Sequence, residues 1–402
     1  MLIKIMIQDN PSLETPPSLV AETPLPLTEP WLIYAIGGGW GHLTRALALG
    51  RIAARERPVF VLCNSPYAAH LLRYEARRRT GSKQFPHPSP PMENPSDFTG
   101  ELLPIVEGCY LHIISPDASD RATRKQVRQV LAAEEYECAI VDTFPKGLGG
   151  ELADILPGLA APRILVHRDI NPDSVRALDW PRFVAENYQL VIVPGEGEGL
   201  PLSHLPGVEH TAPWLIRSAG ELPDVARART LLGLNPALTE PVVAVCAAGR
   251  PQELRLYGHL TRALAEKFTG VTVRCLAPER PKNCPPELWA FHWPAIECLP
   301  AADVVVGGAG YNTFYECAAA GVPLVAFAFE RRYDRQALRA DRAYRRYPGQ
   351  VLRVESVGAA LKAVGHLLSV TTSDRLRPAY RNGAADAVGL ISQLVAERAG
   401  LP

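Results

Sequence analysis

The chain has 402 residues, of which 47% are hydrophobic and 21% charged, and its formal net charge is zero. This length is enough for two domains of ordinary size, each with its own core. The balanced charge argues against a nucleic-acid-binding protein, which needs a basic domain or stripe. No apolar run reaches the roughly 18 to 20 residues that span a bilayer, so the composition favours a cytoplasmic enzyme.

The amino-terminal segment does not look like part of a folded domain. Met1–Ile7 is apolar apart from Lys4, but it is too short for the core of a secretion signal. Residues 11–30 are rich in proline and carry three glutamates. We therefore predict a disordered, proline-rich leader over residues 1–30.

From Trp31 onward, short β-branched runs alternate with segments of helical periodicity, which predicts an α/β fold with parallel sheets covered by helices on both faces. A helix is expected over Leu43–Arg55, and a long proline-rich loop over residues 80–104. The predicted strands of the first half are Trp31–Ile36, Val59–Cys63, Tyr110–Ile114, Ala139–Asp142, Arg163–His167 and Leu190–Val193.

A second alternating unit follows residue 217. We predict two domains, at residues 31–216 and 217–377, and a final helix within residues 378–402 that packs back across the domains. The predicted strands of the second unit are Val242–Cys246, Val271–Leu276, Val304–Val306, Leu324–Phe327 and Val351–Val354. Its predicted helices are Glu253–Phe268, Asn312–Ala320, Arg335–Tyr344 and Val357–Leu368.

The first strand runs into a glycine-rich turn, Gly37-Gly38-Gly39-Trp40-Gly41-His42, and a helix follows. A dinucleotide fingerprint would need a third glycine where His42 stands, and an acidic residue after the next strand. The positive end of a helix disfavours a charged imidazole, so His42 is a candidate neutral base near pH 7. The alternative is a histidine that only satisfies the hydrogen bonds of the loop.

A second strand, turn and helix lies at residues 304–316. Val304-Val305-Val306 is followed by Gly307-Gly308-Ala309-Gly310-Tyr311, and a helix is expected from Asn312-Thr313 with Glu316 one turn later. This order predicts free backbone amides for a diphosphate and a carboxylate for the ribose of a nucleotide. Alternatively, Thr313 and Glu316 have the spacing of a capping box.

These motifs, together with Gly321-Val322-Pro323 and Asp334-Arg335-Gln336, resemble family 28 glycosyltransferases, which include the peptidoglycan N-acetylglucosaminyltransferase and the plant galactolipid synthases. The resemblance implies a GT-B fold, in which two facing Rossmann-like domains enclose a cleft. It also implies metal-independent, inverting transfer of a hexose from a nucleoside-diphosphate sugar, with a UDP-linked donor expected and no cofactor.

The resemblance also assigns roles to residues. His42 matches the proposed base of the family. Arg250 is a weaker candidate for a phosphate contact, because the family has a glycine- and serine-rich turn there. The donor-binding residues it implies are Gly308, Gly310, Tyr311, Asn312, Thr313, Glu316, Asp334 and Gln336. For Asp334 and Gln336, the alternative is a solvated charged surface among neighbouring arginines.

The acceptor side is less defined. Gly39, Trp40 and Gly41 in the turn, and Asp142 and His167 at strand ends, are candidates for the acceptor wall. The acceptor could be a lipid, an isoprenoid carrier or a small soluble molecule, and the donor sugar stays open. If the acceptor is a lipid, peripheral contact with the inner face of the plasma membrane is expected. A sugar-nucleotide epimerase and a silent nucleotide-sugar-binding protein are the competing functions.

Overall fold

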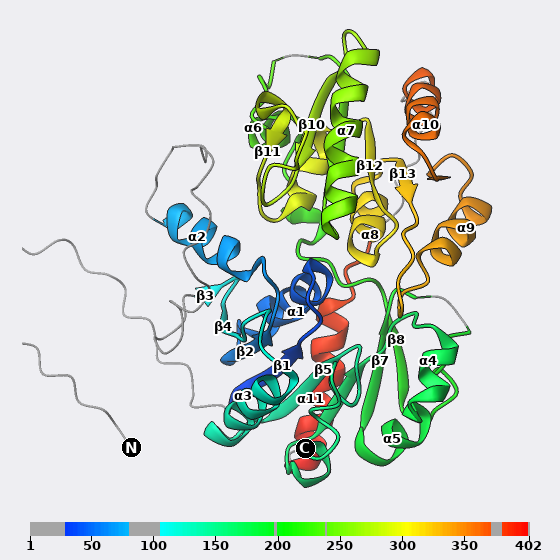
Figure 1. Cartoon of the computed structure of the whole chain (residues 1–402). Helices are drawn as coiled ribbons and strands as arrows, with labels where there is room; N and C mark the ends of the chain where they lie inside the picture. Colours follow the sequence, from blue (N-terminus) through cyan, green and yellow to red (C-terminus); the bar gives the residue numbers. More distant parts are fainter. Residues whose placement is uncertain (1–28, 80–104, 197–198, 238, 371–379, 401–402) are drawn as a thin grey trace, which may run out of the picture.

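The computed structural model describes residues 29–79, 105–196, 199–237, 239–370 and 380–400, which form two α/β halves (Figure 1). The predicted leader lies almost wholly outside these residues, and the predicted loop at 80–104 lies entirely outside them. Each half is built on one sheet, and the halves face each other as two Rossmann-like layers. The predicted fold class is therefore confirmed.

The first sheet has eight strands in the order β3-β4-β2-β1-β5-β6-β7-β8. All neighbours are parallel except β3 and β4, which pair antiparallel. The strands are β1 (Trp31–Ala35), β2 (Val59–Cys63), β3 (Ile105–Val106), β4 (Cys109–Ile113), β5 (Cys138–Asp142), β6 (Arg163–Val166), β7 (Leu190–Pro194) and β8 (Val208–Thr211). The two-residue β3 and the exposed β8 lack the apolar runs from which the other strands were predicted.

Alternate side chains of the first sheet enter two different cores, as a sheet buried on both faces requires. Ile33 belongs to the cluster that contains α1, whereas Leu32 packs with α3 and α5. The helices of this half are α1 (Trp40–Ala53), α2 (Ala68–Arg79), α3 (Asp120–Ala133), α4 (Pro172–Ala177) and α5 (Trp180–Asn187). The final helix, α11 (Ala384–Arg398), packs on α1, β7 and β8, so the end of the chain returns to the first half (Figure 1).

The second sheet has six parallel strands in the order β11-β10-β9-β12-β13-β14. They are β9 (Val242–Cys246), β10 (Thr272–Leu276), β11 (Trp289–Ala290), β12 (Val304–Gly308), β13 (Leu324–Phe327) and β14 (Val351–Val354). The helices are α6 (Val225–Leu231), α7 (Pro251–Lys267), α8 (Tyr311–Ala320), α9 (Gln336–Arg346) and α10 (Val357–Ser369), with a 3-10 helix η5 (Ala295–Ala301) before β12. Every predicted strand of this half is confirmed, with ends that shift by at most two residues.

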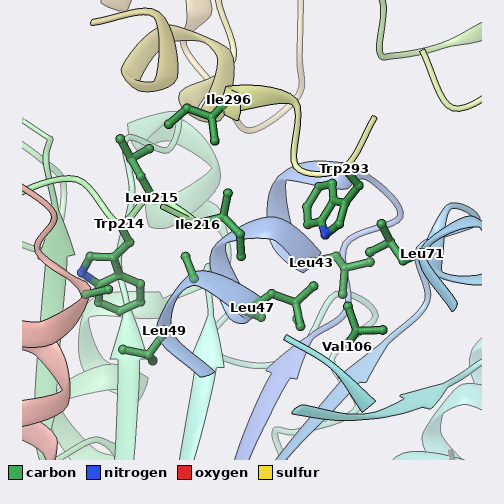
Figure 2. Close-up of a cluster of buried hydrophobic side chains, with 14 of the residues drawn as sticks. Leu43, Leu47, Leu49, Leu71, Val106, Trp214, Leu215, Ile216, Trp293 and Ile296 are labelled. Carbon is green, nitrogen blue, oxygen red and sulfur yellow. The ribbon is translucent and has the colours of Figure 1, made fainter. Parts of the chain in front are cut away.

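The two halves share one apolar cluster, which includes residues of the linker, the segment between β8 and α6 (Figure 2). Leu43 and Leu47 of α1 meet Leu215 and Ile216 of the linker there, and Trp293 and Ile296 come from the second half. None of the described helices combines the length and the apolar character needed to cross a membrane. This shared cluster joins the halves on one side. On the other side, the polar ends of the strands face each other.

Candidate active site

A cavity of about 800 Å³ lies where the carboxyl ends of the two sheets face each other. Ligands of open α/β sheets bind at such strand ends. Most of the predicted site residues line it: Gly39, Trp40, Gly41, His42, Arg250, Gly308, Gly310, Tyr311, Asn312, Thr313, Asp334 and Gln336. The structure thus brings together residues that are almost three hundred positions apart.

His42 forms a buried dyad with Asp142. His42 Nδ1 lies 2.6 Å from Asp142 Oδ2, and the same carboxylate accepts two hydrogen bonds from Arg45, at 2.8 and 2.6 Å. Asp142 and Arg45 are almost fully buried, whereas His42 reaches the cavity. A neutral His42 donates from Nδ1 to the carboxylate, so Nε2 is left as the basic atom.

Burial lowers the pKa of His42, and the nearby Arg45 and Arg168 lower it further, against the opposing effect of Asp142. Burial alone would raise the pKa of Asp142, but Arg45 and His42 outweigh it and hold the Asp142 pKa far below its usual range. At neutral pH, the site therefore contains a neutral imidazole hydrogen-bonded to a carboxylate. This is the protonation state of a general base.

The glycine turn fits around this imidazole. A Cβ atom added at Gly37 would clash with Cδ2 and Nε2 of His42. The Gly37 and Gly38 amides both donate to Asn64 Oδ1, at 3.0 and 2.9 Å, which fixes the start of the turn. Gly37 is therefore required by the position of His42.

Opposite His42, helix α8 begins with its amides uncapped. Its N-cap is Gly310, which has no side chain, so nothing on that residue can satisfy the first amides. The side-chain oxygen of Asn312 is buried and has no hydrogen-bond partner among the described residues. Uncapped amides at a helix start form an anion-binding site.

Glu316 lies one turn further along α8 and lines a second cavity of about 110 Å³ rather than the large one. Because α8 starts at Tyr311 and not after Thr313, the capping-box interpretation of Thr313 and Glu316 is wrong. Burial raises the pKa of Glu316 to about 7. The two cavities share Trp40, Cys246, Ala248, Asn312 and Thr313 on their walls.

The arginines around the large cavity fall into two groups. Those of the first group are matched by carboxylates: Arg331 with Glu253, Arg335 with Asp169, Arg339 with Glu196 and Asp334, and Arg168 with the same two carboxylates at longer range. The second group comprises Arg250 and Arg332, which line the cavity without a carboxylate partner among the described residues. The walls therefore carry two uncompensated positive charges.

The loop between β13 and α9 closes the cavity from the second half. Gln336 Oε1 accepts a hydrogen bond from the Phe329 amide at 3.1 Å, and Asp334 accepts one from Arg339 at 2.8 Å. Asp334 also forms a bridge with Ile170 of the first half. Gln336 is buried and Asp334 is ion-paired, so the alternative of a solvated charged surface does not describe these two residues.

Two candidates for the acceptor wall do not line the cavity. Asp142 lies behind His42, and His167 is fully buried, with neither ring nitrogen bonded among the described residues. Burial lowers the pKa of His167 to about 3. The wall beside His42 is instead apolar and comes from Phe144, Leu148, Ile170 and Tyr333.

Comparison of the whole chain with solved structures identifies the architecture. The chain aligns with the glycotransferase of kitacinnamycin over 92% of its length and 100% of that chain, with a TM-score of 0.54 and 15% identity. It aligns with UGT89C1 of Arabidopsis thaliana, solved with UDP, over 92% and 99% of the two chains, with a TM-score of 0.55 and 13% identity.

A third match is SsfS6 of Streptomyces sp. SF2575, solved with thymidine diphosphate, over 93% and 97% of the chains, with a TM-score of 0.51 and 16% identity. The fold is GT-B. No protein-family model and no curated protein matches the chain, so membership of family 28 stays a prediction. In GT-B terms, the first half faces the second across the cavity that contains His42 and the start of α8.

Three residues in or directly behind this cavity were not predicted as site residues. Arg45 lies one turn after His42 on α1. This spacing indicates a shared role only once it is known that both side chains hydrogen-bond to Asp142. Arg168 follows β6, and its guanidinium stacks 4.5 Å from the centre of the Tyr311 ring. Arg332 lines the cavity from the loop before α9. Long-range contacts, which the sequence does not encode locally, decide the positions of Arg45 and Arg168, whereas Arg332 has no carboxylate partner among the described residues and packs over the ring of its neighbour Tyr333.

Proposed function

We propose that this protein is a glycosyltransferase that moves a hexose from a UDP-sugar to a hydroxyl acceptor, with inversion and without a metal ion. The observation that carries the proposal is the pair formed by His42, held by Asp142 at 2.6 Å, and the uncapped start of α8, both on the wall of one cavity. A base must face a leaving group for in-line displacement. The GT-B neighbours that contain UDP or thymidine diphosphate support a nucleotide donor.

In this mechanism, Nε2 of His42 takes the proton of the acceptor hydroxyl, and the oxygen of that hydroxyl attacks the anomeric carbon of the donor hexose. Asp142 stabilises the imidazolium that forms, and Arg45 keeps that carboxylate charged and oriented. The bond to the β-phosphate breaks on the opposite face of the sugar. Attack from the face opposite to the leaving group inverts the anomeric centre.

The leaving diphosphate is the second requirement. The diphosphate of the bound donor carries two negative charges, which the two unmatched arginines, Arg250 and Arg332, balance. The further negative charge that develops on the β-phosphate as its bond to the sugar breaks is stabilised by the α8 amides. Metal independence rests on this charge balance. Glu316, in the adjoining small cavity, accepts hydrogen bonds from the ribose hydroxyls in the proposed complex.

The acceptor in this proposal is a lipid or an isoprenoid-linked alcohol. Its support is the apolar wall next to His42, where Leu148 is 39% exposed and Phe144 packs against both His42 and Tyr333. An exposed apolar surface beside a base suits an acceptor that brings apolar surface of its own. Leu148→Glu should therefore impair transfer to lipid-linked acceptors more than hydrolysis of the donor.

The test is to incubate the protein with a panel of sugar nucleotides and hydroxyl acceptors, and to follow free UDP and the glycosylated product. His42→Ala should lower turnover by about 10² to 10⁴ while UDP still binds. His259→Ala, a change at an exposed histidine on α7, serves as the matched control and should behave as wild type. A new sugar nucleotide without free UDP would refute transfer in favour of epimerisation, and the absence of any product with bound UDP would indicate a silent binder.

A further inference from the structure

Trp40 occupies an unusual position in the cleft. It is the first residue of α1, and its indole lies parallel to two other rings. The Tyr67 ring of the same half is centred 4.9 Å away at an interplanar angle of 4°, and the Trp293 ring of the opposite half is centred 5.1 Å away at 16°. The stack therefore bridges the two halves of the molecule.

The stack stands at the boundary between the two cavities. Trp40 lines both the cavity of about 800 Å³ with His42 and the cavity of about 110 Å³ with Glu316, whereas Trp293 lines only the smaller one. Ligand pockets for small molecules usually measure about 300 to 1,000 Å³, so the smaller cavity is too tight for a nucleoside as it stands. A donor with its ribose at Glu316 and its hexose near His42 must occupy both cavities.

The chain around Trp40 leaves room for movement. A Cβ atom added at Gly38, Gly39 or Gly41 would meet nothing within 4 Å, so the backbone on both sides of Trp40 borders open space. Trp293 Nε1 is buried and has no hydrogen-bond partner among the described residues. The contact between Trp40 and Trp293 thus rests on stacking between two halves and not on a polar bond from the Trp293 indole.

We propose that Trp40 gates the donor site. This inference rests on the proposed nucleotide-sugar site and assigns Trp40 a positioning role, not a catalytic one. The indole leaves Trp293 to let the nucleoside reach Glu316, then packs against the bound donor and closes it off from solvent. Because entry and exit both require the indole to move, Trp40 controls both rate constants for the nucleotide. A stack that served only to stabilise the fold would leave them unchanged.

The experiment is stopped-flow fluorescence of UDP binding to wild type, Trp40→Ala and Trp40→Phe, with the dissociation constant measured by calorimetry. An aromatic stack is worth up to about tenfold in a rate or equilibrium constant. We therefore expect both the association and the dissociation rate constants of Trp40→Ala to rise by about 3- to 10-fold. The dissociation constant should change by less than about threefold, and Trp40→Phe should show smaller changes in the same direction.

Trp180→Phe alters an indole that lines neither cavity and serves as the control. If wild type binds no UDP, the proposed function itself fails. If wild type binds UDP and Trp40→Ala leaves both rate constants within twofold, the gate is refuted. A rise in the dissociation rate alone would make Trp40 a fixed wall of the site and would also refute the gate. Should Trp40→Ala not fold, Trp40→Phe decides by the same criteria.

Discussion

Glu316→Gln should stabilise the unliganded protein at neutral and alkaline pH. The carboxyl is half-buried against the small cavity, and burial raises its pKa from 4.5 to about 7. An acid whose pKa is higher in the folded state binds its proton more tightly there, so folding stability falls as the pH rises from 4.5 to 7. The full pKa change corresponds to about 3 kcal/mol. Water in the cavity lowers this figure, so we expect about 1 to 3 kcal/mol.

The assay is thermal unfolding of wild type and Glu316→Gln between pH 4.5 and pH 8. At about 2.1 cal/mol/K of unfolding entropy per residue, 1 kcal/mol shifts the midpoint of a 402-residue protein by roughly 1 °C, so the advantage of the variant over wild type should grow by about 1 to 4 °C across this range. Glu221→Gln is the control. The hydrogen bond with Arg51 lowers the pKa of Glu221 to about 2. The difference in unfolding midpoint between Glu221→Gln and wild type should therefore stay constant above pH 4.5.

If the difference in unfolding midpoint between Glu316→Gln and wild type does not change with pH, the raised pKa of Glu316 is refuted. The same variant should bind UDP about 10-fold or more weakly, since it loses charge-assisted hydrogen bonds to the ribose. The variant would then gain folding stability and lose donor affinity, as expected where a group that binds a ligand destabilises the unliganded protein. Equal UDP affinity in wild type and variant would remove Glu316 from the ribose role.

Three further predictions concern His42 and the arginines. Gly37→Ala should lower kcat by at least about 10², because its Cβ would displace the His42 ring. Gly358→Ala, on α10 and away from the cavity, adds a Cβ that also meets open space and should stay within about twofold; equal loss in the two variants would contradict the geometry. Because burial lowers the His42 pKa, the acidic limb of kcat, measured at saturating donor so that Glu316 stays charged against the ribose, should fall below pH 6.5; a limb above that pH would exclude His42 as the base. Arg332→Ala and Arg250→Ala should each weaken the binding of UDP by about 5- to 10-fold in calorimetry. Arg342→Ala, at an exposed position of α9, should leave UDP binding unchanged. Unchanged binding in both Arg332→Ala and Arg250→Ala would remove these arginines from the diphosphate site.

The sequence by itself determined the order of elements and the two glycine-rich turns that line the cavity. Apolar runs such as Val304–Val306 are buried on both faces, and that burial is what makes them continuous and easy to recognise. The glycines before His42 and Asn312 marked the turns for a local reason, since only residues without side chains let a ligand or a ring approach the backbone. The two-residue β3 and β11 and the exposed β8 escaped prediction because none of them buries an apolar run.

Only the tertiary structure decided which side chains meet. Asp142 is the partner of His42, although one hundred residues separate them, because β5 lies beside β1 in the sheet. The sequence also could not show that most arginines of the cavity are paired and that Arg250 and Arg332 are not. Nor could it place Trp40 against Trp293. Such contacts depend on how two halves face each other, and no local pattern of residues encodes that arrangement.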